Sequence, residues 1–180
     1  MGLGSSIACD ISLNSSFTPE QRERYQNTRV IRDILSSTKT IAVVGLSSEA
    51  QKASNMVASY LQDEGFRIVP VNPNAAEILG EKSYPDLASI PYPIDLVDIF
   101  RPAAEVPALV EQAIGLRAKA VWMQLRIISF PAADRALAAG LSVVMDRCIK
   151  MEHGRFSGSL HWAGMNTEIV TARRGGKKAG

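Results

Sequence analysis

The sequence predicts a three-layer α/β fold in a single domain, in which helices cover both faces of a parallel sheet. Short apolar runs rich in β-branched residues alternate with helical patterns about every 25 residues. Alternation of this kind produces parallel strands joined by right-handed helical crossovers. The length of 180 residues and the apolar content of 46% suit one domain with a sizeable core.

The first predicted strand, Thr40–Val44, carries the clearest indication of a ligand site. It ends at Gly45, and Ser47 and Ser48 follow before a helical pattern begins near Ala53. A glycine at this point lets the backbone approach a phosphate, and the N–H groups that open the next helix attract an anion. This order of strand, glycine loop and helix is typical of Rossmann-like nucleotide-binding domains. A side chain at position 45 is therefore expected to block a phosphate while leaving the fold intact.

An N-terminal helix is predicted before this strand. Thr18 is a suitable N-cap, Pro19 favours the first turn, and one helical pattern continues to about Leu35. Its apolar stripe is expected to pack against the edge of the sheet. The stripe consists of Val30, Ile31, Ile34 and Leu35.

The later elements continue the alternation. The predicted strands lie at 66–71, 94–100, 118–123 and 141–145, and the predicted helices at 53–64, 103–116 and 131–139. A loop with a short strand is expected over 78–84, and one helical turn over 86–90. Gly65 is expected to end the first of these helices, and Pro107 requires the next to begin between 103 and 106. The side chains expected to face inward from helix 53–64 are Met56, Val57, Tyr60 and Leu61.

The two ends of the chain differ in composition from its centre. Residues 1–17 are rich in Ser, Gly and Asn and predict a flexible N-terminus, and residues 175–180 form part of a basic flexible tail. The domain itself is expected over 18–174. The first six residues fit the loose myristoylation pattern, but a small-residue terminus is the simpler interpretation.

Charge and cysteine content argue against several classes of protein. A net charge of +2 is too small to indicate nucleic-acid binding. No apolar run approaches the about 20 residues of a membrane span, and no secretory signal is visible, so we expect a cytoplasmic protein. Cys9 and Cys148 do not form a disulfide framework. His153 and His161 lack metal-ligand spacing, and no metal is expected.

Ligands of open parallel sheets bind beyond the carboxyl ends of the strands, so the residues at these ends are the candidate site. The second strand ends at Asn72 and Pro73, where NAD-binding domains usually carry an acid for the ribose hydroxyls. A neutral amide does not repel a phosphorylated ribose, which disfavours NAD and leaves NADP or coenzyme A. The same two residues are also typical of a simple turn.

Cationic side chains gather near these strand ends and could hold phosphates. Each alone is typical of a surface ion pair, and together they favour an anionic ligand. Asp95 and Asp98 are three residues apart in one strand and face opposite sides, so we interpret them as helix or loop partners and assign no catalytic residue. The cations are Lys52, Arg101, Arg126 and Arg147.

Five motifs follow the strands in register: Val43–Ser47, Val69–Pro73, Val97–Arg101, Val121–Gln124 and Val144–Cys148. In order and spacing they resemble the small stand-alone CoA-binding proteins, which are single Rossmann domains similar to the CoA-binding domain of succinyl-CoA synthetase. Lys150–His153 and Gly164–Thr167 continue the likeness, which covers about residues 25–174. Two departures concern the first loop, where Lys52 replaces an arginine and two prolines are missing, and the bulkier segment Leu125–Ile127.

The resemblance implies coenzyme A as the ligand and no particular reaction. The leading prediction is therefore a CoA or acyl-CoA binding protein without catalysis of its own, whose protein partner is left open. The alternatives are an NADP-dependent oxidoreductase, for which no general acid is found, and a nucleotide-sensing regulatory domain. The predicted ligand-binding residues are Gly45, Leu46, Ser47, Ser48, Lys52, Ser54, Asn72, Pro73, Phe100, Arg101, Gln124 and Arg147.

Cys148 allows two interpretations. It follows the last strand beside Arg147 and Lys150, whose charges would favour a thiolate able to form a mixed disulfide with the CoA thiol. The alternative, which we favour, is a buried structural cysteine.

Overall fold

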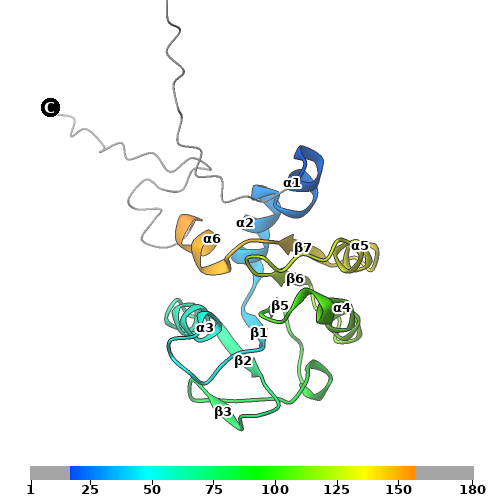
Figure 1. The fold of residues 1–180 in the computed structure, drawn as a ribbon. Coiled ribbons are helices and arrows are strands. Elements are labelled where there is room, and N and C mark those ends of the chain that lie inside the picture. The colour runs from blue at the N-terminus through cyan, green and yellow to red at the C-terminus, as the bar shows by residue number, and fades with distance from the viewer. Residues whose placement is uncertain (1–16, 157–180) are drawn as a thin grey trace, which may run out of the picture.

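A five-stranded parallel sheet in the order β2-β1-β5-β6-β7 lies at the centre of the protein, in a computed structural model that describes residues 17–156 (Figure 1). The predicted Rossmann-like α/β fold is therefore confirmed. The predictions for the flexible N-terminus, the basic tail, Cys9, His161 and the motif at 164–167 lie outside the described residues. The strands are β1 Thr40–Val44, β2 Arg67–Val71, β5 Leu96–Ile99, β6 Ala120–Met123 and β7 Ser142–Met145.

The register brings the carboxyl ends of all five strands to one edge of the sheet. Val44 at the end of β1 lies beside Val71 of β2 and Ile99 of β5. Ile99 in turn lies beside Met123 of β6, which lies beside Met145 of β7. Residues that follow these positions therefore meet at the same edge, where an open parallel sheet binds ligands.

Alternating strand residues build a core on each face of the sheet. Val97 and Val121 pack toward α4 (Val106–Gly115) and α5 (Phe130–Ala138). Trp122 and Val144 pack on the other side, toward α2, α3 and α6. Figure 1 shows α3 and α6 on one side of the sheet and α4 and α5 on the other. The helices of the second face are α2 Thr28–Ser37, α3 Ala53–Asp63 and α6 Ile149–Phe156.

The prediction of one N-terminal helix is wrong, because the chain forms two. Helix α1 (Pro19–Tyr25) ends before Asn27, whose side-chain oxygen accepts hydrogen bonds from the first-turn N–H groups of Arg29 (2.8 Å) and Val30 (3.2 Å) of α2. An N-cap of this kind starts a new helix. The Gln26 side chain between the helices donates to the carbonyl of Met145 (3.1 Å) and ties the corner to the end of β7. The stripe residues Ile31, Ile34 and Leu35 are buried, as predicted.

In α3 the predicted inward face is partly wrong. Val57 and Leu61 are buried, but Met56 is 52% exposed. Ser54 and Asn55 are buried instead, because their side chains bond to the loop before the helix. The buried face of α3 is therefore rotated away from Met56.

The other elements follow the predictions closely, with one omission. Gly65 follows α3 with a positive φ of 93°, and the one-turn helix η2 (Ala103–Glu105) precedes α4, so that Pro107 lies in the first turn of α4. Helix α6 was not predicted. No helix in the described part of the chain is long and apolar enough to span a membrane. The short elements are β3 Glu77–Ile78, β4 Glu81–Lys82 and η1 Leu87–Ser89.

Candidate functional site

The candidate site lies at the carboxyl ends of three adjacent strands, β2, β1 and β5. The loop at 45–52 (the Gly45 loop) follows β1, the turn at 72–74 follows β2, and Phe100 and Arg101 follow β5. Gln124 and Arg147 follow β6 and β7, farther along the same edge. The fold thus brings the predicted residues to one edge, but it gives them different surroundings.

Gly45 is a position that no other residue can occupy without strain. Its φ is +83°, and a Cβ atom there would lie 2.8 Å from Cδ of Arg101 and 3.0 Å from the carbonyl oxygen of Phe100. Its own N–H donates to the carbonyl of Val71 (3.0 Å). The backbone at Gly45 therefore packs closely against Phe100 and Arg101, which follow β5. A side chain at position 45 would disturb this packing as well as any bound phosphate. We therefore expect a side chain at this position to destabilise the fold, in contrast to the prediction from the sequence.

The loop after Gly45 is fixed by hydrogen bonds to its own helix. The Ser47 N–H donates to Oγ of Ser54 (3.1 Å), and the Asn55 side chain donates to the carbonyl of Ser47 (2.8 Å). Oγ of Ser47 accepts the N–H of Glu49 (3.1 Å). Both hydroxyl groups accept in these bonds, so each retains a proton to donate to a ligand. These bonds hold the loop in place against the first turn of α3.

Helix α3 presents an uncapped N-terminus beside this loop. Lys52 occupies the N-cap position, and no side chain of the described residues caps the helix. The first-turn N–H groups and the helix dipole therefore attract negative charge. The Lys52 ammonium is exposed and lies 4.0 Å from the Glu49 carboxylate, at the limit of an ion pair.

Asn72 connects the end of β2 to the Gly45 loop. Its side-chain N–H donates to the carbonyl of Leu46 (2.8 Å), and its side-chain oxygen accepts the N–H of Asn74 (2.8 Å). An aspartate could not donate the first bond. Asn72 thus has a structural role that is independent of any ribose, and the predicted turn is confirmed. Leu46 is fully buried beneath the loop, whereas Pro73 is exposed.

Arg101 extends over the Gly45 loop and is held by Glu105. Nε and Nη2 of Arg101 donate to the two carboxylate oxygens of Glu105, each at 2.9 Å. This bond lowers the pKa of the Glu105 carboxyl. Glu105 was not among the predicted residues, although its spacing of four from Arg101 is a recognisable ion-pair signal.

Gln124 lies below the edge and contacts a buried acid. Its side chain is buried and donates to Oδ1 of Asp98 (2.9 Å). Oδ2 of Asp98 has no hydrogen-bond partner among residues 17–156. Burial raises the Asp98 pKa to about 7, although the bond from Gln124 lowers it. Asp98 and Gln124 therefore form a pair that is buried from solvent.

Arg147 is part of a network that holds α6 and the N-terminal helices. Its guanidinium donates to Glu152 (3.4 Å) and to the Gln26 side chain (3.2 Å). Glu152 is buried and also pairs with Arg155 (3.1 Å). Of the four predicted cations, Lys52 and Arg101 flank the Gly45 loop, whereas Arg147 is engaged beyond β7. Arg126 is exposed, and its backbone N–H donates to Asp146 (2.7 Å).

Cys148 is half-buried at the start of α6. Burial raises the pKa of its thiol, and hydrogen bonds from the backbone N–H groups of Met151 and Lys150 only partly offset this. The neutral thiol is thus favoured, which supports the structural interpretation of this cysteine. The described residues contain no group of three His, Cys, Asp or Glu side chains placed to hold a metal ion.

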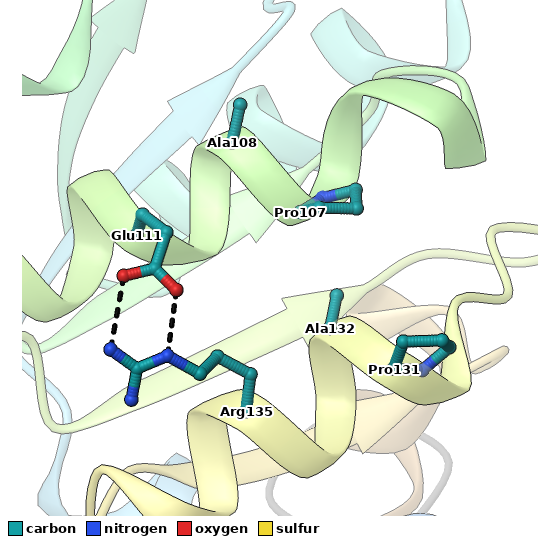
Figure 2. Close-up of a pocket in the computed structure, with 6 residues that line it drawn as sticks. All are labelled: Pro107, Ala108, Glu111, Pro131, Ala132 and Arg135. Carbon is teal, nitrogen blue, oxygen red and sulfur yellow. Dashed lines mark hydrogen bonds and ion pairs between the residues drawn. The ribbon is translucent and has the colours of Figure 1, made fainter.

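A hollow of about 310 Å³ lies elsewhere, between α4 and α5 (Figure 2). Figure 2 shows Glu111 of α4 and Arg135 of α5 joined by two hydrogen bonds across it, at 2.7 and 3.1 Å. The hollow contains none of the predicted site residues and is not part of the candidate site. Its lining residues are Pro107, Ala108, Glu111, Pro131, Ala132 and Arg135.

Comparison with known families identifies the domain. The model of the CoA binding domain matches residues 39–154, from the start of β1 into α6. The chain belongs to this family. The resemblance seen in the strand-end motifs is therefore confirmed.

Relatives of this CoA-binding domain include proteins of similar size and parts of larger ones. It is 39% identical over 123 residues to the uncharacterized protein YneT of Bacillus subtilis, a match that covers 68% of this chain and 91% of YneT. A hypothetical protein from Pyrococcus horikoshii OT3 has the same fold, with 41% identity, a TM-score of 0.69, and coverage of 71% of this chain and 90% of that one.

A longer relative is the acetate–CoA ligase [ADP-forming] II of Archaeoglobus fulgidus. It is 36% identical over 95 residues, which cover 51% of this chain and only 14% of the ligase. The match therefore concerns one small region of that enzyme.

Proposed function

We propose that this domain binds CoA or acyl-CoA at the carboxyl ends of β2, β1 and β5 and performs no reaction of its own. One observation carries the proposal: the uncapped N-terminus of α3 lies beside the Gly45 loop, and Arg101 extends over that loop. Unpaired N–H groups, a helix dipole and a guanidinium around one loop form a site for phosphate.

The neighbouring residues suit the parts of such a ligand. The first-turn N–H groups of α3 and the hydroxyl groups of Ser47, Ser48 and Ser54 would donate to the pyrophosphate. Lys52 and Arg101 would supply charge. The turn at Asn72 and Pro73 would border the adenosine end.

The family relationship supports coenzyme A over other nucleotides with phosphate. The acetate–CoA ligase relative, by its name, uses CoA, and it is 36% identical to this chain over 95 residues. The proposal assigns no reaction, because the acid near this edge, Asp98, is fully buried and bonded to Gln124.

Thermal unfolding with a panel of nucleotides tests the proposal. CoA and acetyl-CoA are expected to raise the midpoint of unfolding, because a ligand that binds only the folded state stabilises it by mass action. NAD is expected to leave the midpoint unchanged, since Asn72 supplies no acid for the ribose hydroxyls. Equal stabilisation by NAD and CoA would contradict the proposal, and a response to NADP alone would favour an oxidoreductase.

Replacing Lys52 by alanine is expected to weaken CoA binding by about 1–2 kcal/mol, if its ammonium contacts a phosphate. The loss should shrink at high salt, because the side chain is exposed. Calorimetric titration measures both. Lys39→Ala is the matched control, since Lys39 is also exposed but precedes β1 at the opposite edge of the sheet. Equal affinities of the two variants would leave Lys52 as a surface residue.

A further inference from the structure

We propose that the Arg101 guanidinium is a phosphate subsite that the Glu105 carboxylate fills from within the chain, so that Glu105 determines which ligands bind. The inference rests on the proposed function and deepens it. It assigns to this subsite ligands that carry a phosphate group, and it makes Glu105 a specificity-determining residue.

The Arg101–Glu105 pair is bidentate. Arg101 donates from Nε and Nη2 to the two oxygens of Glu105, at 2.9 Å each. Two parallel bonds from one guanidinium edge are the arrangement in which arginine also binds phosphate. The Glu105 carboxylate therefore occupies the same edge that a ligand phosphate would use.

Arg101 lies beside the Gly45 loop. The Arg101 side chain lies against Gly45 at the start of the loop, since its Cδ lies 2.8 Å from the position of a Cβ on Gly45. The N-terminus of α3 follows the same loop. A phosphate bound by the helix N–H groups would thus lie near the Arg101 guanidinium, and it would compete with Glu105 for it.

The Glu105 side chain does not cap the helix that it precedes. It occupies the N-cap position of α4, but its side chain makes no capping bond to the helix. Its backbone N–H donates to the carbonyl of Pro102 (2.9 Å), so η2 is held by main-chain atoms. The carboxylate can therefore leave Arg101 without loss of a helix cap.

Exposure makes the exchange with a ligand possible. The side chains of Arg101 and Glu105 are 47% and 45% exposed, and ion pairs at such positions are weak. A pyrophosphate carries two negative charges where the carboxylate carries one, and it can form the same two parallel bonds with the guanidinium, so it can compete with Glu105. A ligand without phosphate cannot compete in this way, so the ion pair between Arg101 and Glu105 remains formed.

Calorimetric titration of Glu105→Gln with CoA tests this inference. The variant is expected to bind CoA about two- to fivefold more tightly than the wild type, because Arg101 is released from its carboxylate partner. Glu111→Gln is the matched control: Glu111 also pairs with an arginine, at 2.7 Å and with 54% exposure, but lies in α4 beside the hollow. It should leave CoA affinity unchanged. Pantetheine, which has no phosphate, should bind both variants as it binds the wild type.

A second pair of variants shows whether Glu105 acts through Arg101. Arg101→Ala should weaken CoA binding, and adding Glu105→Gln to it should restore nothing. A gain of the same size in the Arg101→Ala background would overturn the inference, because Glu105 would then act only by general repulsion. No gain in Glu105→Gln alone would overturn it as well, while wild-type binding of CoA would still uphold the proposed function. Failure of the wild type and all variants to bind CoA would reject both.

Discussion

Replacing Gly45 by alanine is expected to destabilise the domain by about 3 kcal/mol or more and to weaken CoA binding strongly. The backbone at this position has a φ of +83°, which costs energy for any residue with a Cβ. The new Cβ would also meet Arg101 and the backbone carbonyl of Phe100 at 3.0 Å or less. The backbone cannot move aside without disturbing β5. Chemical denaturation measures the loss of stability, and calorimetric titration measures the loss of affinity.

Gly140→Ala is the control for this prediction. Gly140 has a similar φ of +87°, but a Cβ there would meet nothing within 4 Å. The difference between the two variants isolates the close approach of β5 to the Gly45 loop. Equal destabilisation would show that the backbone conformation alone matters, and unchanged CoA affinity in Gly45→Ala would place the phosphate elsewhere.

The buried acid Asp98 is expected to make the domain less stable as pH rises from about 4 to about 7. Burial raises its pKa from 3.8 to about 7 in the folded protein. Between these values the folded state holds a proton that the unfolded state has released, so stability falls as pH rises and then levels off. A shift of this size corresponds to at most about 4 kcal/mol.

Asp98→Asn is expected to remove this dependence. At pH 3 the variant should match the wild type, because Asp98 is then mostly neutral in both the folded and the unfolded state. At pH 9 it should be more stable than the wild type by about 2–3 kcal/mol, since the cost of a buried charge exceeds that of an unpaired amide. Denaturation curves at both pH values measure the change.

Asp95→Asn is the control with the opposite sign. Burial acts to raise the Asp95 pKa, but hydrogen bonds from Lys119 and from the N–H groups of Thr40 and Lys39 lower it overall. Its contribution to stability is present above pH 4 and is lost as pH falls. The variant should therefore be less stable than the wild type at pH 9. A gain of stability in both variants at pH 9 would contradict the distinction between the two acids.

Much of the sheet was predictable because a buried parallel strand requires an apolar run, and such runs have few other uses in a chain of this composition. The predicted strand at 40–44 matches β1 in full, and Pro107 placed the start of α4 within one turn. Two errors have local causes. Asn27 starts a second helix within a stretch that the sequence pattern presents as one helix, and α6 follows β7 with no strong helix signal in its sequence.

The predictions for the candidate site were likewise correct for some residues and not for others. Gly45, Lys52 and Arg101 were predicted, and the structure places all three around one loop, because strand ends in a parallel sheet meet at one edge. Their partners were not predictable in the same manner. Glu105 has the spacing of an ion-pair partner for Arg101, but its bond also depends on the turn η2, and Gln124 faces Asp98 only through the pairing of β5 with β6.

The sequence by itself determined the fold, the family and the edge of the sheet at which a ligand would bind, because these depend on periodicity and on residues at strand ends. Only the tertiary structure decided which of those residues are free to meet a ligand. Arg147 is held by Glu152 and Gln26, and Gln124 is buried against Asp98. The bonds of Arg147 to Gln26 and of Gln124 to Asp98 join residues far apart in the chain, and no local pattern records them. Periodicity specifies which face of an element is buried, whereas the use of a polar side chain depends on its neighbours in space.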